Sequence, residues 1–394
     1  MTHAYIVDAV RTPGGRRNGR LSQTHPVDLG AMVIDALLAR TKIEPASVDD
    51  VIFGCVSQIG PQTFNIARTS ILASQLPESV PGVSIDRQCG SSQQSIHFAA
   101  QAVMSGTQDV IIAGGVEVMS QVPILSAKDV AVQAGMASPF DSKKLQARYP
   151  GCEFSQFDGA EKMAKKYGVT RDALDHFAWQ SHMKGKAAYE QGKFAEELIA
   201  FDVELEIEGK RMTVRHERDE GLRDNATLDA IAALQPLLPD GLITAGTASQ
   251  VCDGAAAVLI MSERAMKASG LTPIARIHAM SVVGSDPTMV LEGPIPATEK
   301  ILKQTGLSID DIDLYEVNEA FGSVPLAWAN AFGASLDKLN VNGGAQALGH
   351  PLGATGAKLM GTLAYELRRR QAKYGLLAIC EGLGTANATI IERC

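Results

Sequence analysis

The chemistry that this sequence can support centres first on Cys89, in the segment SIDRQCGSSQQSIHFAAQAV (84–103). A strand is predicted to end near Gln88, and a helix is predicted to begin directly after the cysteine. The sulfur would then face unpaired backbone N–H groups and the positive end of the helix dipole, which favour the nucleophilic thiolate. The alternative interpretation is a buried structural cysteine at a strand–helix turn.

A second candidate is His350, in the glycine-rich run NGGAQALGHPLGATGAK (342–358). Pro351 suits the first turn of a helix, which places His350 in its N-cap region. A histidine there can move a proton or donate a hydrogen bond to a carbonyl oxygen. The run does not continue into the GK[ST] of a phosphate-binding loop, so a nucleotide site is disfavoured. A structural histidine is the alternative.

Two further segments end strands in the same way. Cys380 closes the apolar run YGLLAIC and is followed by EGLGTAN, in which Gly382 offers a bare backbone N–H. Asn318 lies in YEVNEAFG (315–322), where another strand leads into an apolar helix. Open α/β sheets assemble ligand sites where strands end, so we expect all four segments to meet.

The elements that must position these residues follow an α/β pattern. The chain has 394 residues, 45% hydrophobic and 5% aromatic, with 37 glycines, which suits many tight strand–helix turns. Strands are predicted at Tyr5–Asp8, Val51–Cys55 and Val110–Ala113, and helices near Leu29–Arg40 and from Gly90 to Ser105. The alternation favours a mainly parallel sheet covered on both faces.

The order of elements is repeated along the chain. SVDDVIFG (47–54) is similar to SIDDIDLY (308–315), and each follows a helical stretch. Cys89 is followed by a helix and DVIIAGG (109–115), and His350 by a helix and GLLAICEGLG (375–384). The sequence therefore predicts a duplicated unit, with chance similarity of short apolar segments as the alternative.

Three regions are predicted. Residues 1–120 and 249–270 form the N-terminal half, 121–248 an inserted loop domain, and 271–394 the C-terminal half. The insertion is rich in basic side chains, which form either a solvated face or a platform for a phosphorylated ligand. These side chains are Lys143, Lys144, Lys162, Lys165, Lys166, Arg211, Arg215 and Arg218.

Charge and patterning exclude several classes. The net charge is −8 without a long basic run, which argues against a nucleic-acid partner. No apolar stretch reaches the roughly 18 residues of a membrane span, and the N-terminus does not resemble a signal peptide. The six cysteines form no CxxC pair, which argues against a disulfide framework. A cytoplasmic protein is expected.

Four segments together resemble the thiolase family. They are the CGSS turn at Cys89, TAGTASQVCDGAAAVL (244–259), VNEAF (317–321), and GGAQALGHPLGATG with CEGLG. The resemblance extends over essentially the whole chain. It implies a thiolase-like α/β fold, in which two duplicated βαβαβ-type halves form five layers (αβαβα) and a loop domain covers the active site.

The resemblance also implies roles for single residues. Cys89 would be the nucleophile that becomes acylated, and His350 would activate its thiol. Cys380 would be the acid/base at the α-carbon or at the CoA sulfur. Asn318 would order a water that completes an oxyanion site with His350, while the N–H groups of Cys89 and Gly382 would form a second.

The implied substrates are coenzyme A and acyl-CoA thioesters. Arg223 and Ser249 match positions that contact CoA in the family, and Phe321 matches its pantetheine channel. The enzyme would cleave 3-ketoacyl-CoA with CoA, or condense two acyl-CoAs in reverse. No metal or redox cofactor is required, because the thioester already acidifies its α-hydrogens. The family leads us to expect a homodimer or a homotetramer.

The expected substrate differs from acetoacetyl-CoA. Thiolases specific for acetoacetyl-CoA carry a His-Met-Gly or Ser-Met-Gly stretch where this chain has Ser155-Gln156-Phe157. We therefore expect longer or bulkier acyl groups. The alternatives are an acetoacetyl-CoA-specific acetyltransferase, a ketoacyl synthase, and a non-catalytic CoA- or lipid-binding protein. A ketoacyl synthase would decarboxylate its donor and would not need Cys380 as a base.

Overall fold

The computed structural model describes residues 3–394, so the first two residues of the predicted N-terminal half lie outside the description. Ten strands form one mixed sheet, ordered β10-β11-β12-β9-β1-β8-β5-β3-β4, with β2 paired to β8. The strands are β1 (Ala4–Arg11), β2 (Gly15–Arg16), β3 (Asp50–Gly54), β4 (Gly82–Ile85), β5 (Val110–Val118), β8 (Cys252–Ser262), β9 (Ala275–Gly284), β10 (Leu314–Val317), β11 (Tyr374–Glu381) and β12 (Thr385–Arg393).

The sheet consists of two halves with the same pairing plan. In the first half β3 runs parallel to β5, and β5, β8 and β1 follow as antiparallel neighbours. In the second half β10 runs parallel to β11, and β11, β12 and β9 follow in the same way. The halves join where β1 pairs with β9 at Tyr5–Arg276 and Ile6–Ala275. This duplication confirms the prediction from the repeated sequence order.

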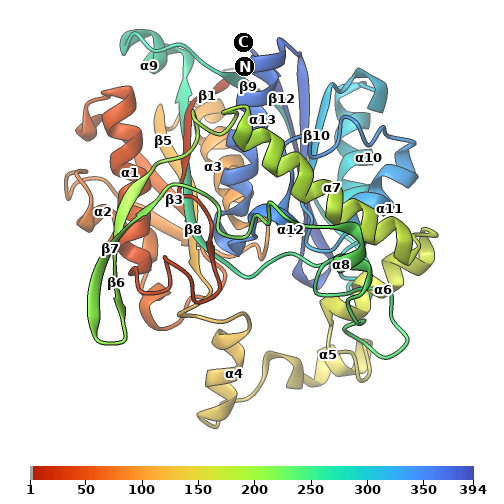
Figure 1. Ribbon diagram of the computed structural model, residues 1–394. Coiled ribbons are helices and arrows are strands. Elements are labelled where there is room, and N and C mark those ends of the chain that lie inside the picture. The colour runs from red at the N-terminus through yellow and green to blue at the C-terminus, as the bar shows by residue number, and fades with distance from the viewer. Residues whose placement is uncertain (1–2) are drawn as a thin grey trace.

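The helices complete five layers (Figure 1). Three separate hydrophobic clusters lie between the layers, one on the outer face of each half and one between the halves. The outer helices are α1 (Pro26–Thr41) and α2 (Ile66–Ala73) on the first half, and α10 (Pro294–Thr305) and α11 (Ser323–Phe332) on the second. The central layer is α3 (Ser91–Ser105) and α13 (Thr355–Arg370). The predicted fold class is confirmed.

Local sequence explains how these elements begin and end. Helix α1 starts with Pro26 at its first position and ends where Lys42 takes a left-handed conformation at φ 54°. Helix α3 ends at Gly106, which has φ 78° and donates its N–H to the last turn. Strand β5 is buried along its whole length, because helices cover both faces of the sheet.

The segment predicted as an insertion contains helices and a hairpin. Its elements are α4 (Ser126–Gln133), α5 (Lys143–Arg148), α6 (Gln156–Lys166), α7 (Arg171–Glu190), β6 (Phe201–Ile207), β7 (Lys210–His216) and α8 (Leu228–Ala232). Helices α4 and α5 project from the lower side of the layered body in Figure 1. The boundaries at 121 and 248 stay a prediction. Helix α9 (Glu263–Ala268) follows β8, and α12 (Ala345–Leu348) precedes His350.

A buried ion-pair network fastens this segment to the sheet. Arg11 of β1 donates to Glu197 at 2.6 Å and to Asp219 at 2.8 Å, and all three side chains are buried. Removing one member of such a network leaves a buried charge without its partner, at a cost of roughly 3–5 kcal/mol. Within residues 3–394, the structure contains no helix that is long and apolar enough to cross a membrane.

Candidate active site

The Cys89 turn begins earlier than the sequence predicts. Strand β4 ends at Ile85 rather than near Gln88, because the Asp86 carboxylate accepts the N–H of Gln88 at 2.7 Å and turns the chain. Gln88 adopts a left-handed conformation at φ 48°. Ser91 then accepts the N–H of Arg87 at 2.9 Å and begins α3, so the predicted helix start is close to the observed one.

The expected thiolate at Cys89 is not supported by its surroundings. Burial, together with the charge that Glu381 carries when ionised, raises the pKa of the Cys89 thiol to about 12, against a lowering by the residue's own N–H. The loss of solvation outweighs the favourable helix N-terminus. The free thiol therefore keeps its proton at neutral pH, and a base must remove it.

The loop of His350 also differs from the prediction. Pro351 is the N-cap of a 3₁₀ turn at Leu352–Ala354, and α13 begins only at Thr355, so His350 lies directly before the start of a 3₁₀ turn rather than of an α-helix. The Thr355 hydroxyl donates to the Pro351 carbonyl at 2.9 Å and lies 2.6 Å from His350 Nδ1. Since this hydroxyl has used its own proton, it accepts one from Nδ1 and leaves Nε2 as the basic nitrogen.

His350 is neutral in this setting. Burial, and to a lesser extent the charge of Lys358, lower the pKa of its imidazole to about 3. Lys358 is itself buried and donates to the carbonyls of Leu348 and Gly349 at 2.7 and 3.0 Å, which fixes the loop. The Nδ2 atom of Asn318 lies 3.3 Å from His350 Nε2, so Asn318 stands beside the basic nitrogen as expected.

Cys380 lies fully buried near the end of β11. Burial raises the pKa of its thiol well above the usual range, and a negative charge on Cys89 would add to this rise. Gly382 follows and packs on the Cys89 turn, where a Cβ at this position would lie 2.8 Å from Gln88 Oε1. The strand end that carries Cys380 thus touches the turn that carries Cys89.

The two central helices bring the histidine loop to the same place. The Ser92 hydroxyl accepts the N–H of Ala357 at 3.0 Å, which joins the first turns of α3 and α13. A Cβ at Gly356 would lie 2.1 Å from the backbone nitrogen of Gln93, so only glycine permits this approach. These contacts place the turn of Cys89, the strand end of Cys380 and Gly382, and the loop of His350 with Asn318 next to one another.

Ser249 and Phe321 are held beside this group by backbone contacts. The N–H of Ser249 donates to Ala320 O at 2.9 Å, and the neighbouring Gln250 carbonyl accepts the N–H of His350 at 3.1 Å. Arg223 lies farther along, where its N–H donates to His182 Nδ1 at 3.3 Å. The side chain of Gln250 links that region to the site by donating to Gly221 O at 2.9 Å.

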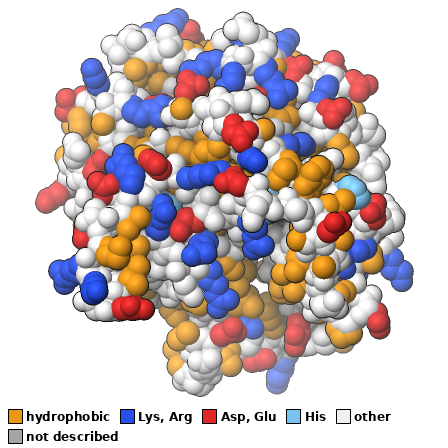
Figure 2. All heavy atoms as spheres, viewed as in Figure 1, with side chains coloured by type: hydrophobic (Ala, Val, Ile, Leu, Met, Phe, Trp, Pro, Cys, Tyr) orange, Lys and Arg blue, Asp and Glu red, His pale blue; other side chains and the backbone are white. Residues whose placement is uncertain are grey.

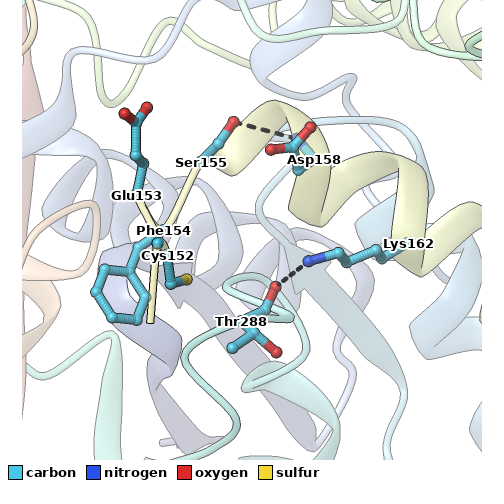
Figure 3. Close-up of a pocket in the computed structure, with 8 residues that line it drawn as sticks. Cys152, Glu153, Phe154, Ser155, Asp158, Lys162 and Thr288 are labelled. Carbon is cyan, nitrogen blue, oxygen red and sulfur yellow. Dashed lines mark hydrogen bonds between the residues drawn. The ribbon is translucent and has the colours of Figure 1, made fainter. Parts of the chain in front are cut away.

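A polar pocket of about 300 Å³ lies at the start of α6 (Figure 3). Its lining residues are Gly151, Cys152, Glu153, Phe154, Ser155, Asp158, Lys162 and Thr288. Figure 3 shows Lys162 reaching across to Thr288, whose carbonyl accepts from its Nζ at 3.0 Å. Phe157 of α6 packs on the ring of Phe321, with centroids 5.6 Å apart. The pocket therefore adjoins the predicted pantetheine channel.

Sequence reasoning missed three residues of this site. Thr355 and Lys358 set the tautomer and the loop of His350, and Glu381 lies buried beside both cysteines. Two of them carry a visible signal, since Lys358 is a lone cation in a glycine-rich apolar run and Glu381 ends an apolar strand. Thr355 has no such signal, because its role depends on the 3₁₀ turn.

Family comparisons agree with this geometry. Residues 4–264 match the model of the thiolase N-terminal domain, and residues 271–393 match that of the thiolase C-terminal domain. The chain belongs to the thiolase family. The thiolase interpretation is thereby confirmed over a ketoacyl synthase or a non-catalytic binding protein, and the enzyme is an acyltransferase.

Three thiolase relatives are informative. The Steroid 3-ketoacyl-CoA thiolase FadA6 of Mycobacterium tuberculosis is 54% identical, over 100% of this chain and 95% of its own. A 3-ketoacyl-CoA thiolase of Idiomarina loihiensis is 42% identical over 100% of both chains. The crystal structure of the Bacillus anthracis acetyl-CoA acetyltransferase superposes with a TM-score of 0.89 at 35% identity, covering 100% of this chain and 99% of that one.

Proposed function

We propose that this thiolase cleaves 3-ketoacyl-CoA with coenzyme A, giving acetyl-CoA and an acyl-CoA shortened by two carbons. The observation that supports the proposal is the packing of the turn of the part-buried Cys89 against the strand end of the buried Cys380, with the loop of a neutral His350 joined to the same helix start. One thiol can serve as nucleophile only if the imidazole takes its proton, and the second thiol supplies an acid for the carbanion.

The steps balance with these residues alone. His350 Nε2 takes the Cys89 proton, and the thiolate attacks the ketone carbon of the substrate. The bond between the α-carbon and the ketone carbon then breaks, which leaves an acyl-Cys89 thioester and the enolate of acetyl-CoA. Cys380 protonates the enolate, and its thiolate next takes the proton of the incoming CoA thiol. That CoA attacks acyl-Cys89 and releases the shortened acyl-CoA, and the Cys89 thiolate that leaves takes its proton back from His350.

Two sets of donors support the charges that develop. We propose that Asn318 holds a water which, together with the His350 imidazole, stabilises one thioester oxygen. The N–H groups of Cys89 and Gly382 serve the second oxygen, and their closeness is supported by the packing of Gly382 on the Cys89 turn. Arg223, Ser249 and Phe321 are proposed to bind CoA along the channel that leads to this point.

We further propose that the acyl group is bulky. The support is the 54% identity with a relative named for steroid substrates and the Ser155-Gln156-Phe157 stretch. A degradative role in acyl-chain shortening follows from this proposal. We also propose that the enzyme is located in the cytoplasm, and cell fractionation tests this location.

The test compares acetoacetyl-CoA, a medium-chain 3-ketoacyl-CoA and one with a polycyclic acyl group, using wild type and Cys89→Ala. Faster cleavage of the larger substrates, lost in the variant, supports both proposals. Activity confined to acetoacetyl-CoA would retain the mechanism but refute the bulky acyl group. Activity in Cys89→Ala would refute the nucleophile.

We propose self-association through two surfaces. Strand β4 lies at the end of the sheet with one edge unpaired, beside the exposed side chains of Phe64, Leu72 and Val83. Such an edge invites pairing with a second copy. Helix α4 and its flanks expose a second apolar group, visible on the lower projection in Figure 2. Its members are Ile124, Leu125, Val130, Val132 and Met136.

The first surface would make a homodimer, and the second would join dimers into a homotetramer. Val83→Lys should then yield monomers, while Val132→Asp should stop association at the dimer. Analytical ultracentrifugation of both variants and wild type measures the states. A wild type that sediments as a monomer at micromolar concentration contradicts the proposal.

A further inference from the structure

Glu381 is a buried carboxyl group that the mechanism above does not use. It ends β11 directly after Cys380 and is fully buried. Within residues 3–394, neither of its carboxyl oxygens has a hydrogen-bond partner. Its neighbour across the sheet, Thr385, instead directs its hydroxyl to Gly382 O at 3.3 Å. A buried carboxylate without donors is costly, so this group is held in its neutral form.

The carboxyl lies against the nucleophile turn. A Cβ at Gly90, the residue after Cys89, would stand 1.8 Å from Glu381 Oε1, so glycine is needed there to admit the carboxyl. The side chain thus connects the strand end of Cys380 with the turn of Cys89. The Glu381 side chain therefore lies between the turn that carries Cys89 and the strand end that carries Cys380.

A second buried carboxylate shows what a purely structural one looks like. Glu117 accepts the N–H groups of Val56, Ser57 and Gly353, and the side-chain amide of Gln62, at 2.8–3.1 Å. Those donors satisfy its charge and fasten three loops together. Glu381 has none of these contacts, so loop fastening does not account for it.

We propose that Glu381 is a positioning residue for the two thiols, which must carry its own proton for Cys89 to react. When the carboxyl ionises, its charge opposes thiolate formation at Cys89 and at Cys380. The ionisation of Glu381 therefore sets the alkaline limit of catalysis. The inference rests on the proposed roles of the two cysteines.

The surrounding charges are consistent with such a switch. Burial raises the pKa of Glu381 to about 8, against a lowering by the nearby Thr385 side chain and by the charge of Arg87, while the charge of Asp86 adds to the rise. Arg87 and Asp86 both lie in the loop before α3. The two thiols, Cys89 in that turn and Cys380 in the same strand, are the other ionisable groups that face it. The ionised carboxylate raises the pKa of both thiols.

The test is the pH profile of Glu381→Gln beside wild type and Asp86→Asn. Glutamine has the shape of the neutral acid but cannot ionise. The control removes a nearby exposed carboxylate and keeps an Oδ1 acceptor for the N–H of Gln88. We expect kcat/KM of wild type to fall about tenfold per pH unit above about pH 8, and that of the control to fall equally steeply from a slightly lower pH, because Asp86 raises the pKa of Glu381. In Glu381→Gln this fall should be absent.

A second readout does not need turnover. The rate of Cys89 alkylation by iodoacetamide, followed by mass spectrometry, should level off above about pH 8 in wild type. In Glu381→Gln the rate should keep rising, to about tenfold above wild type at about pH 9. Identical pH profiles of wild type and Glu381→Gln overturn the proposal. A loss of kcat/KM in Glu381→Gln that is equal at every pH overturns it too, because such a loss indicates a packing role.

The two proposals fail in different ways. If Cys89 is not the nucleophile, Cys89→Ala remains active, whatever the profile of Glu381→Gln. If Glu381→Gln does not fold, Glu381→Leu replaces it with the same expected pH profile. The alkylation rate of wild-type Cys89 must in any case level off near pH 8.

Discussion

The Cys89 thiol and the His350 imidazole are both neutral in the free enzyme, because burial raises the pKa of the first to about 12 and lowers that of the second to about 3. Proton transfer between them is therefore unfavourable until a substrate oxygen can share the charge with preorganised donors. A thiol kept protonated in this way is also protected from oxidation and from stray electrophiles while the site is empty.

The first residue-scale prediction concerns Thr355. Thr355→Val removes the acceptor of the His350 Nδ1 proton, so the imidazole is free to adopt the other tautomer. We expect kcat to fall about 10- to 100-fold with KM little changed, since general-base catalysis contributes roughly 10²–10⁴-fold. Steady-state thiolysis kinetics measure the change. Thr355→Ser, which keeps the hydroxyl, is the matched control and should retain most of the activity.

At the scale of elements, the contact between α3 and α13 places Cys89 and His350 at one junction. Gly356→Ala would put a methyl group 2.1 Å from the Gln93 nitrogen and force the helices apart. We expect a loss of about 1–3 kcal/mol in the free energy of unfolding and a larger loss of activity. Urea denaturation and thiolysis assays test both.

The control for that prediction is Gly361→Ala in the same helix, where the added Cβ would meet only the Ala9 methyl group at 3.0 Å. Its effect on unfolding should be smaller, because alanine favours the helix by up to about 1 kcal/mol over glycine. Equal losses in both variants would contradict the special role of the Gly356 contact.

Repeated local patterns made much of the fold predictable. A 3₁₀ turn leads into a strand at both segments: Pro45–Ser47 ends at the first residue of SVDDVIFG before β3, and Ile309–Asp311 lies within SIDDIDLY before β10. The His350 loop was predicted less well, because Pro351 suits the start of a 3₁₀ turn as well as that of an α-helix. Glu381 could not be assigned at all, since its environment depends on Gly90, which lies far away in the sequence.

The whole molecule should show the ionisation of Glu381 in its stability. Its pKa is raised from 4.5 unfolded to about 8 folded, so its neutral form favours the folded state below pH 4.5. That contribution is lost as pH rises through about 8, at about 1.4 kcal/mol per pH unit. Glu381→Gln has no carboxyl group to ionise at this position, so it should not show this loss of stability.

We therefore expect Glu381→Gln to gain stability relative to wild type between about pH 5 and about pH 9. Chemical denaturation of both proteins across this range measures the difference in the free energy of unfolding. A constant difference at every pH would mean that the carboxyl does not titrate in the folded enzyme. Asp86→Asn again serves as the control.

The pairing of β1 with β9 has a consequence for chain connectivity. It brings the two chain ends together, since Arg276 of β9 contacts both His3 (3.4 Å) and Glu392 (2.7 Å), and both termini lie at the top of Figure 1. A short linker could join them, and a new opening at the exposed β6–β7 turn, Glu208–Gly209, would leave every site contact in place. Such a circular permutant should fold and retain thiolysis, because catalysis depends on contacts within the folded protein and not on the order of the two halves along the chain.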